Sequence, residues 1–117
     1  MMPPRGKILV VSHDPDLADI RRRVLENAGF EVVAARDARA VKTTCAEHKL
    51  LLVMMGYSLP PSEKRRVWAE VKEHCEIPVL ELHKIGEPEL VSPAFFHESH
   101  VADDFLKTVI SIVKRKS

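Results

Sequence analysis

Several residue types and patterns are scarce in this chain of 117 residues, and each scarcity excludes a class of protein. The two cysteines, Cys45 and Cys75, do not form a CxxC pair, so no metal or redox motif of that kind is predicted. No apolar run approaches the roughly 20 residues of a membrane span, and the start, Met1–Lys7, lacks the apolar region of a signal peptide. The formal charge of +1 creates no field that would favour nucleic acid or an anionic membrane. We therefore expect a cytoplasmic protein with reduced cysteines.

Signatures of catalysis are also missing. The sequence contains no nucleophile–base pair, no paired carboxylates and no glycine-rich phosphate loop, so we expect neither an enzyme nor a bound cofactor. What the chain does have is 45% hydrophobic residues together with 30% charged residues, an ordinary globular composition. At this length, residues 1–117 are expected to form one domain with a substantial core.

Short apolar runs alternate with amphipathic stretches along the chain, which predicts right-handed βαβ units and a parallel sheet. In the first helix, Leu17, Ile20, Val24 and Leu25 are expected to face the core, and Arg21–Arg23 to form a solvated face. Strands are expected at Lys7–Val11, Phe30–Ala35, Leu50–Met55 and Ile77–Leu82, and helices beginning at Pro15 or Asp16, after an N-cap at Asp37, after an N-cap at Ser62, and at Asp103.

Four phrases carry a resemblance to a known family. KILVVSHDPDL, LENAGFEVV, YSLP and IPVLEL occur in the order and at the separations found in receiver domains of bacterial two-component response regulators, the CheY-like family. The resemblance implies an α/β, flavodoxin-like fold with a doubly wound, five-stranded parallel sheet in the order 2-1-3-4-5. It also implies a mechanism, since that family works by phosphorylating an aspartate beside a magnesium ion.

The residues that perform this chemistry are replaced in the present chain. Gly56 has no side chain that could form an aspartyl phosphate, and Ser12 and His13 are poor ligands for magnesium, which prefers several anionic oxygens. The resemblance therefore implies a degenerate phosphorylation pocket. Its members are Gly56 at the acceptor position, Ser12 and His13 at the acidic metal-binding positions, His83 at the switch position and Ser92 at the lysine position.

Two other uses of this pocket stay open. His13 and His83 follow neighbouring strands, so their imidazoles could converge over the gap at Gly56 and bind a small ligand or zinc, copper or nickel. They could equally fill vacated space and form local hydrogen bonds. A relocated phosphoryl acceptor is the other possibility, since Asp14, Asp16 and Ser58 lie nearby in sequence and Asp14 directly follows the first strand.

The resemblance becomes weaker after His83. The segment Glu89–Val91 followed by Ser92-Pro93 resembles the fifth strand of the family, and only eight residues separate His83 from Ser92. A helix of the usual ~11 residues does not fit there, so we expect the fourth helix to be missing or reduced and the surface to be rebuilt. The candidates for a partner surface in the rebuilt region are Phe95, Phe96, His97 and His100.

The sequence thus predicts a stand-alone, non-phosphorylatable pseudo-receiver that acts as a protein–protein interaction module in bacterial signalling. Its partner is expected to be another protein, not nucleic acid or a membrane, and the chain itself a monomer or weak homodimer. The alternative is a small-ligand or metal-sensing domain that uses the crevice between His13 and His83.

Overall fold

The computed structural model describes residues 6–56, 58–83, 95–98 and 106–116. Strands alternate with helices through most of this length, as the apolar runs predict. The elements are β1 (Lys7–Val11), α1 (Pro15–Asn27), β2 (Glu31–Ala35), α2 (Arg39–Glu47), β3 (Leu50–Met55), α3 (Pro61–His74), β4 (Val79–His83), β5 (Phe95–Glu98) and α4 (Leu106–Lys116). Over these ranges, no helix combines the length and the apolarity needed to cross a membrane.

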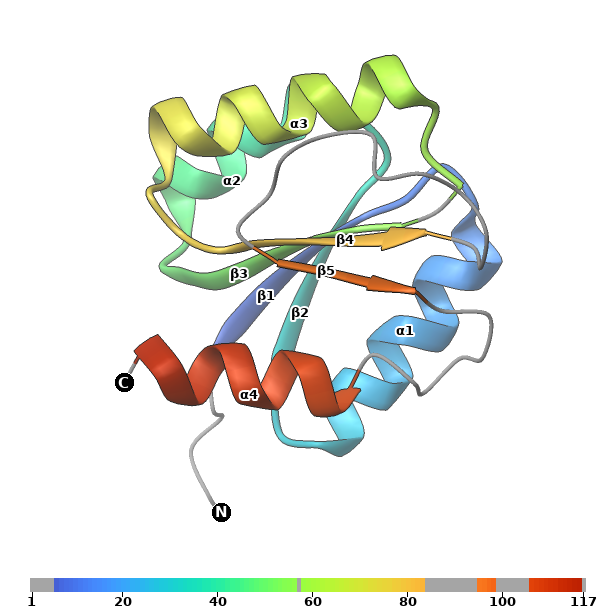
Figure 1. Ribbon diagram of the computed structural model, residues 1–117, viewed down its shortest axis with the longest axis vertical. Helices are drawn as coiled ribbons and strands as arrows, with labels where there is room; N and C mark the ends of the chain where they lie inside the picture. The colour runs from blue at the N-terminus through green and yellow to red at the C-terminus, as the bar shows by residue number, and fades with distance from the viewer. Residues whose placement is uncertain (1–5, 57, 84–94, 99–105, 117) are drawn as a thin grey trace.

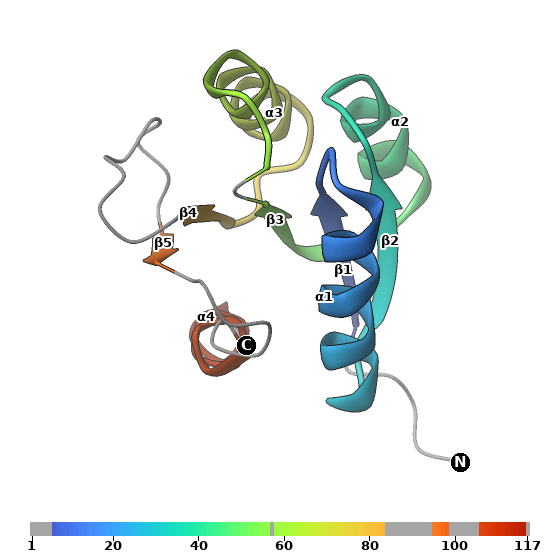
Figure 2. The ribbon, with the colours of Figure 1, turned by 90° about the vertical axis from the view of Figure 1, so that its right-hand side faces the viewer.

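The strands form one parallel sheet in the order β2-β1-β3-β4-β5. Helices α2 and α3 cover one face of the sheet, and α1 and α4 cover the other (Figures 1 and 2). Each face buries its own apolar cluster beneath its pair of helices. The structure confirms the predicted α/β class with a parallel sheet that has helices on both faces.

The central strand β1 shows why this sequence forms a two-sided sheet. Successive side chains of a strand point to opposite faces. Leu9 and Val11 accordingly pack beneath α2 and α3, whereas Ile8 and Val10 pack beneath α1 and α4, and all four are fully buried. Burial of one such side chain stabilises the fold by about 1.5–3 kcal/mol. With apolar residues on both faces, β1 reads as a continuous hydrophobic run.

Helix α1 begins as predicted but presents a different face to the core. Asp14 is its N-cap and accepts hydrogen bonds from the backbone N–H groups of Asp16 and Leu17, and Pro15 is its first residue. The prediction for the helix face was wrong at two residues, because Ile20 is 40% exposed whereas Arg21 is only 4% exposed. A turn of 3.6 residues places Arg21 on the same stripe as the buried Leu25, four residues later.

The starts of α2 and α3 differ from the predicted caps. Asp37 does hold the start of α2, since its carboxylate accepts from the N–H of Arg39, but the N-cap residue is Ala38. Ser62 lies inside the first turn of α3, which begins at Pro61 after an N-cap at Pro60. Proline is pre-organised for the first helical position, so the proline pair fixes this start earlier than the serine would.

The predicted fifth strand was also wrong. The strand beside β4 is Phe95–Glu98, not Glu89–Val91, so Ser92 does not stand at its carboxyl end. Aromatic residues favour strands, and Pro93 cannot donate to a ladder of hydrogen bonds. A helix between the fourth and fifth strands was predicted to be missing because only eight residues separate His83 from Ser92. Residues 84–94 in fact separate β4 from β5, so this reason no longer applies. That helix would fall outside the described residues.

A covalent link joins the two helices on one face of the sheet. Cys45 of α2 and Cys75, the C-cap of α3, form a disulfide with their Cα atoms 5.6 Å apart. The expectation of two separate reduced thiols is therefore corrected. The pair is separated by 30 residues of sequence and meets because α2 and α3 pack side by side.

Candidate functional site at the carboxyl ends of the strands

The space next to Gly56 is filled by an arginine. Gly56 follows β3, and its N–H donates to the carbonyl of Val11 at 2.9 Å. A Cβ atom built on Gly56 would lie 2.5 Å from Nη1 of Arg21 and 3.3 Å from Oγ of Ser12. The space in which a side chain at position 56 would begin is thus occupied by the end of the Arg21 guanidinium, which would have to move to admit one. Because arginine does not lose its proton in proteins, the positive charge stays there at any ordinary pH.

This role of Arg21 was missed by sequence reasoning, which grouped it with Arg22 and Arg23 as a solvated triplet. Only the latter two are exposed, and both pair with Asp19 one turn earlier. The hydrogen bond from Arg22 holds the pKa of Asp19 below its usual value and raises the pKa of Arg22 in turn. The spacing of Arg21 from Leu17 and Leu25, four residues in each direction, is the signal that could have identified it.

Ser12 belongs to a small hydroxyl network. It is 2% exposed, and its Oγ lies 3.0 Å from Oγ of Ser58 in the loop after β3. The same Oγ donates to the carbonyl of Asp14 at 3.2 Å, and the N–H of Asp14 approaches both serine hydroxyls at 3.3 Å. These bonds tie the turn after β1 to the loop after β3. Ser12 therefore has a structural role in place of metal binding.

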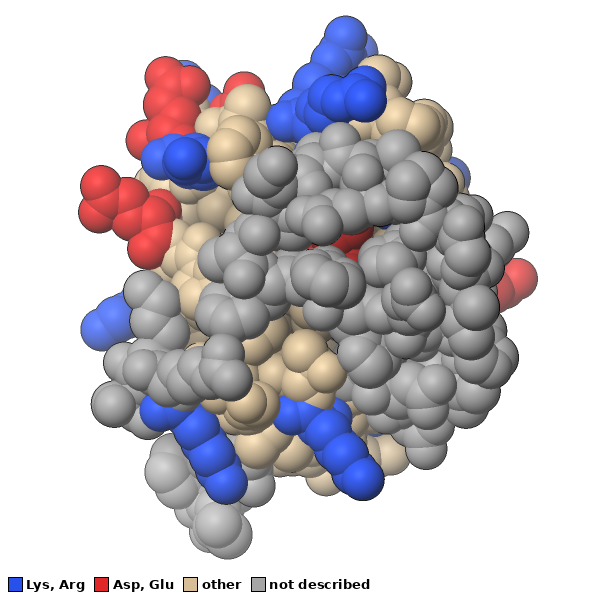
Figure 3. Space-filling model, viewed as in Figure 1, with Lys and Arg blue, Asp and Glu red and all other residues tan. Residues whose placement is uncertain are grey.

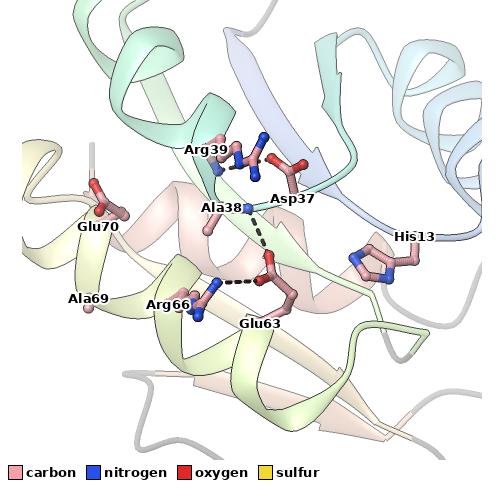
Figure 4. Close-up of a pocket in the computed structure, with 8 residues that line it drawn as sticks. All are labelled: His13, Asp37, Ala38, Arg39, Glu63, Arg66, Ala69 and Glu70. Atoms are coloured by element: carbon pink, nitrogen blue, oxygen red, sulfur yellow. Dashed lines mark hydrogen bonds and ion pairs between the residues drawn. The ribbon is translucent and has the colours of Figure 1, made fainter.

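His13 lies in a pocket between α2 and α3. This pocket has a volume of about 550 Å³, and its described lining does not include Gly56 or Ser12. Figure 4 shows Glu63 at its centre, with one carboxylate oxygen accepting from the N–H of Ala38 at 3.0 Å and the other 3.5 Å from Nη1 of Arg66. The residues that line it are His13, Asp37, Ala38, Arg39, Glu63, Arg66, Ala69 and Glu70.

The structure places His13, one of the two histidines that were predicted to converge, but not the side chain of the other, His83. His83 is the last residue of β4, but its side chain lies outside the described part of the structure. In the described residues, no three His, Cys, Asp or Glu side chains come together as a metal site would require. The convergence therefore remains a prediction.

A magnesium ion, which the resemblance implies, does not fit the residues that remain. The hydroxyl of Ser12 is engaged with Ser58 and Asp14, and the carboxylate of Asp14 caps α1. The guanidinium of Arg21 would repel a divalent cation placed beside Gly56. Among the residues that the structure describes, the site lacks the anionic oxygens that magnesium requires, so these side chains support no metal-dependent step.

The other predicted positions lie toward the edge of the sheet. Phe95, Phe96 and His97 belong to β5, which pairs with β4 and is the edge strand of the sheet among the described residues. The register places Glu98 beside His83, so a glutamate, and not Ser92, occupies the carboxyl end of this strand. Ser92 and His100 lie outside the described residues.

A buried ion pair was not anticipated from the sequence. Nζ of Lys64 in α3 lies 3.0 Å from a carboxylate oxygen of Glu81 in β4, and both side chains are fully buried. Lys64 also donates to the carbonyl of Leu82 at 3.1 Å. The other carboxylate oxygen of Glu81 has no hydrogen-bond partner within the described part of the chain. The charged residue inside the apolar run IPVLEL was the available signal.

Comparison with known proteins agrees with this architecture. No family model matches the chain, and no curated protein sequence matches it significantly. Solved structures do match. The receiver domain of an HD domain-containing protein from Pseudomonas fluorescens is 14% identical, with a TM-score of 0.79 and 98% of each chain covered. A CheY-like receiver domain protein from Methanospirillum hungatei is 18% identical, with a TM-score of 0.78 and 95% of each chain covered.

The chain has the receiver fold. A third structure, the chemotaxis response regulator CheY4 of Vibrio cholerae, agrees at 19% identity and a TM-score of 0.67, over 92% of this chain and 98% of that one. At such low identities the likeness establishes the fold and not the chemistry. Gly56, which the resemblance places at the acceptor position, lies beside the guanidinium of Arg21 in this fold.

Proposed function

We propose that this chain is a pseudo-receiver, a two-component signalling domain that acts through protein contacts without being phosphorylated. The observation that carries the proposal is the guanidinium of Arg21 in the space where a side chain of residue 56 would begin. Phosphoryl transfer to a receiver needs a carboxylate nucleophile and a magnesium ion. The site offers a fixed positive charge and two neutral hydroxyls in their place.

The same geometry argues against Asp14 as a relocated acceptor. One oxygen of its carboxylate accepts from two backbone N–H groups, those of Asp16 and Leu17, at 2.9 and 3.3 Å. Phosphorylation of this carboxylate would disturb the cap of α1, which is worth about 1 kcal/mol. The carboxylate of Asp14 therefore acts as the N-cap of α1.

Intact-mass spectrometry after incubation with magnesium and acetyl phosphate tests the proposal that the chain is not phosphorylated. We expect no phosphoryl adduct on the wild-type chain, and a receiver domain that retains its aspartate serves as the positive control. An acid-stable, base-labile adduct that maps to Asp14 would refute the proposal. An adduct elsewhere that requires magnesium would refute it as well.

The proposed contact surface is the edge of the sheet at β5. An edge strand presents backbone N–H and C=O groups that can pair with another chain, and β5 ends the sheet next to β4. In the coloured part of the face shown in Figure 3, acidic and basic side chains are intermixed over α3 and basic side chains lie over α4, so these described residues do not form a patch of a single sign. A protein partner suits such a surface better than nucleic acid does.

The matched experiment compares substitutions at this edge with one on a distant helix. Phe95→Ala and Phe96→Ala should abolish co-purification of a partner from the native cell, whereas Ile20→Ala on the exposed side of α1 should not. Circular dichroism must show that the variants remain folded. Retention of the partner by the double Phe95→Ala/Phe96→Ala variant would remove β5 as the contact surface.

One observation favours small-ligand binding as a second candidate. The pocket lined by His13 has a volume within the range of ligand sites, roughly 300–1,000 Å³. Thermal melts with zinc, nickel or magnesium test this candidate, because binding to the folded state raises its apparent stability. A rise with zinc or nickel that disappears in His13→Ala would support it, and unchanged melts with all three metals would exclude metal sensing.

A further inference from the structure

The two cysteines lie at the C-terminal ends of α2 and α3, the helices that cover one face of the sheet. Cys45 is near the end of α2, and Cys75 caps the end of α3. Their Cα separation of 5.6 Å falls at the centre of the range that a disulfide spans without backbone movement. Both residues are half-buried, packing on the apolar cluster beneath the helices. Neither residue is fully buried, as reaction of the pair with a small reagent requires.

Helix α2 has little stability of its own, so the disulfide matters more to α2 than to the other helices. It has nine residues, and because its N-cap residue is Ala38, the side-chain support at its start comes from Asp37, which precedes the cap. Its interior contains the β-branched residues Val41, Thr43 and Thr44, which lower helix propensity. So short a helix is marginal without tertiary contacts. The contacts that hold α2 to α3 include the bond between Ala38 N–H and Glu63 at one end and the disulfide at the other.

From these observations we propose that Cys45 and Cys75 form a reversible thiol–disulfide site that controls the order of α2, and with it the pocket between α2 and α3. The proposal is independent of phosphorylation at residue 56. In a reducing cytosol such a pair is held mainly as thiols, and a disulfide forms when the thiol pool is oxidised. The responsive surface is the pocket lined by His13 and Glu63, which lies between the two helices.

The reagent class is a small-molecule disulfide such as oxidised glutathione. The thiolate of one cysteine attacks a sulfur of oxidised glutathione and releases one glutathione thiolate, which leaves a mixed disulfide on the protein. The second cysteine thiolate attacks the protein sulfur of that mixed disulfide, forms the Cys45–Cys75 bond and releases the second glutathione. The protein loses two electrons and two protons, and two molecules of glutathione thiol are formed.

The test uses the full chain in buffers of reduced or oxidised glutathione. Alkylation followed by intact-mass spectrometry counts free thiols, and hydrogen exchange reports the order of each helix. We expect oxidation to protect both cysteines from alkylation, to raise the melting temperature by about 10 °C, and to slow exchange in α2 at least about tenfold. Exchange in α1, which has its own cap at Asp14, should slow less than exchange in α2.

The control variant is Cys45→Ala/Cys75→Ala, which should exchange like the reduced wild type in both buffers. If this variant does not fold, the comparison of the oxidised and reduced wild-type chain carries the test alone. Cysteines that remain open to alkylation in oxidised glutathione would overturn the proposal. Equal exchange of α2 in the oxidised and reduced chain would also overturn it.

Discussion

The buried pair of Lys64 and Glu81 offers the sharpest test of the energetics. Both side chains are fully buried, with 3.0 Å between Nζ and the nearer carboxylate oxygen. Lys64→Met removes the cation and leaves a carboxylate whose second oxygen already lacks a partner among the described residues. Glu81→Leu leaves the ammonium with the carbonyl of Leu82 alone. Each single substitution therefore strands a charge in the core.

The expected magnitudes follow from the cost of an unpaired buried charge. Removing one partner of a buried pair costs about 3–5 kcal/mol, whereas replacing both by apolar residues is neutral or stabilising by about 1–4 kcal/mol. We therefore expect each single variant to lose about 4 kcal/mol of unfolding free energy. The double variant Lys64→Met/Glu81→Leu should recover at least the wild-type stability. The control is Arg66→Met, which removes the pair between the exposed side chain of Arg66 and the partly buried Glu63, and should change stability by less than about 0.5 kcal/mol.

Urea unfolding followed by circular dichroism and by fluorescence of Trp68, the single tryptophan, measures these changes. With a slope of about 2 kcal/mol per molar urea, a loss of 4 kcal/mol moves the midpoint by about 2 M. Single variants that stay within about 1 kcal/mol of the wild type would mean that the pair is well solvated. A double variant less stable than either single variant would refute the reasoning that the single variants lose stability because each leaves one unpaired charge in the core.

Three further predictions concern single positions. Gly56→Asp should not restore phosphorylation by acetyl phosphate, since the new carboxylate would meet Nη1 of Arg21. The double variant Gly56→Asp/Arg21→Ala should also fail, because the site still lacks ligands for magnesium. Magnesium-dependent phosphorylation of either variant, detected by mass spectrometry, would contradict this account of the site. Glu76 has a φ of +51°, so Glu76→Gly should stabilise the protein by about 0.5–1 kcal/mol in urea unfolding, whereas Arg65→Gly on exposed α3 should destabilise it by about 1 kcal/mol. The pKa of Asp19 is lowered in the folded state, so its contribution is present at neutral pH and is lost as the pH falls through that depressed value, below about pH 4. A stability–pH profile of Asp19→Asn should therefore be flatter than that of the wild type in this acidic window, and identical profiles would show that the pairs with Asp19 contribute nothing.

The sequence itself determined the layered α/β class and most of its elements. Runs such as Lys7–Val11 and Leu50–Met55 are short and apolar on both faces, a pattern and length typical of strands covered on both sides, and their predicted bounds agree with the structure. Gly56 could be placed at the end of a strand for the same reason. The absence of a carboxylate there needed no coordinates, because it is a property of the residue alone.

The tertiary structure decided which distant residues share that space. The burial of Arg21 depends on how α1 lies against β3, and the contact of Lys64 with Glu81 depends on the packing of α3 over β4. The link between Cys45 and Cys75 likewise depends on α2 lying beside α3. Local patterns specify strands and helices because their periodicity is set by the backbone. The contacts between elements are long-range, and only the packed fold brings their charges and sulfur atoms together.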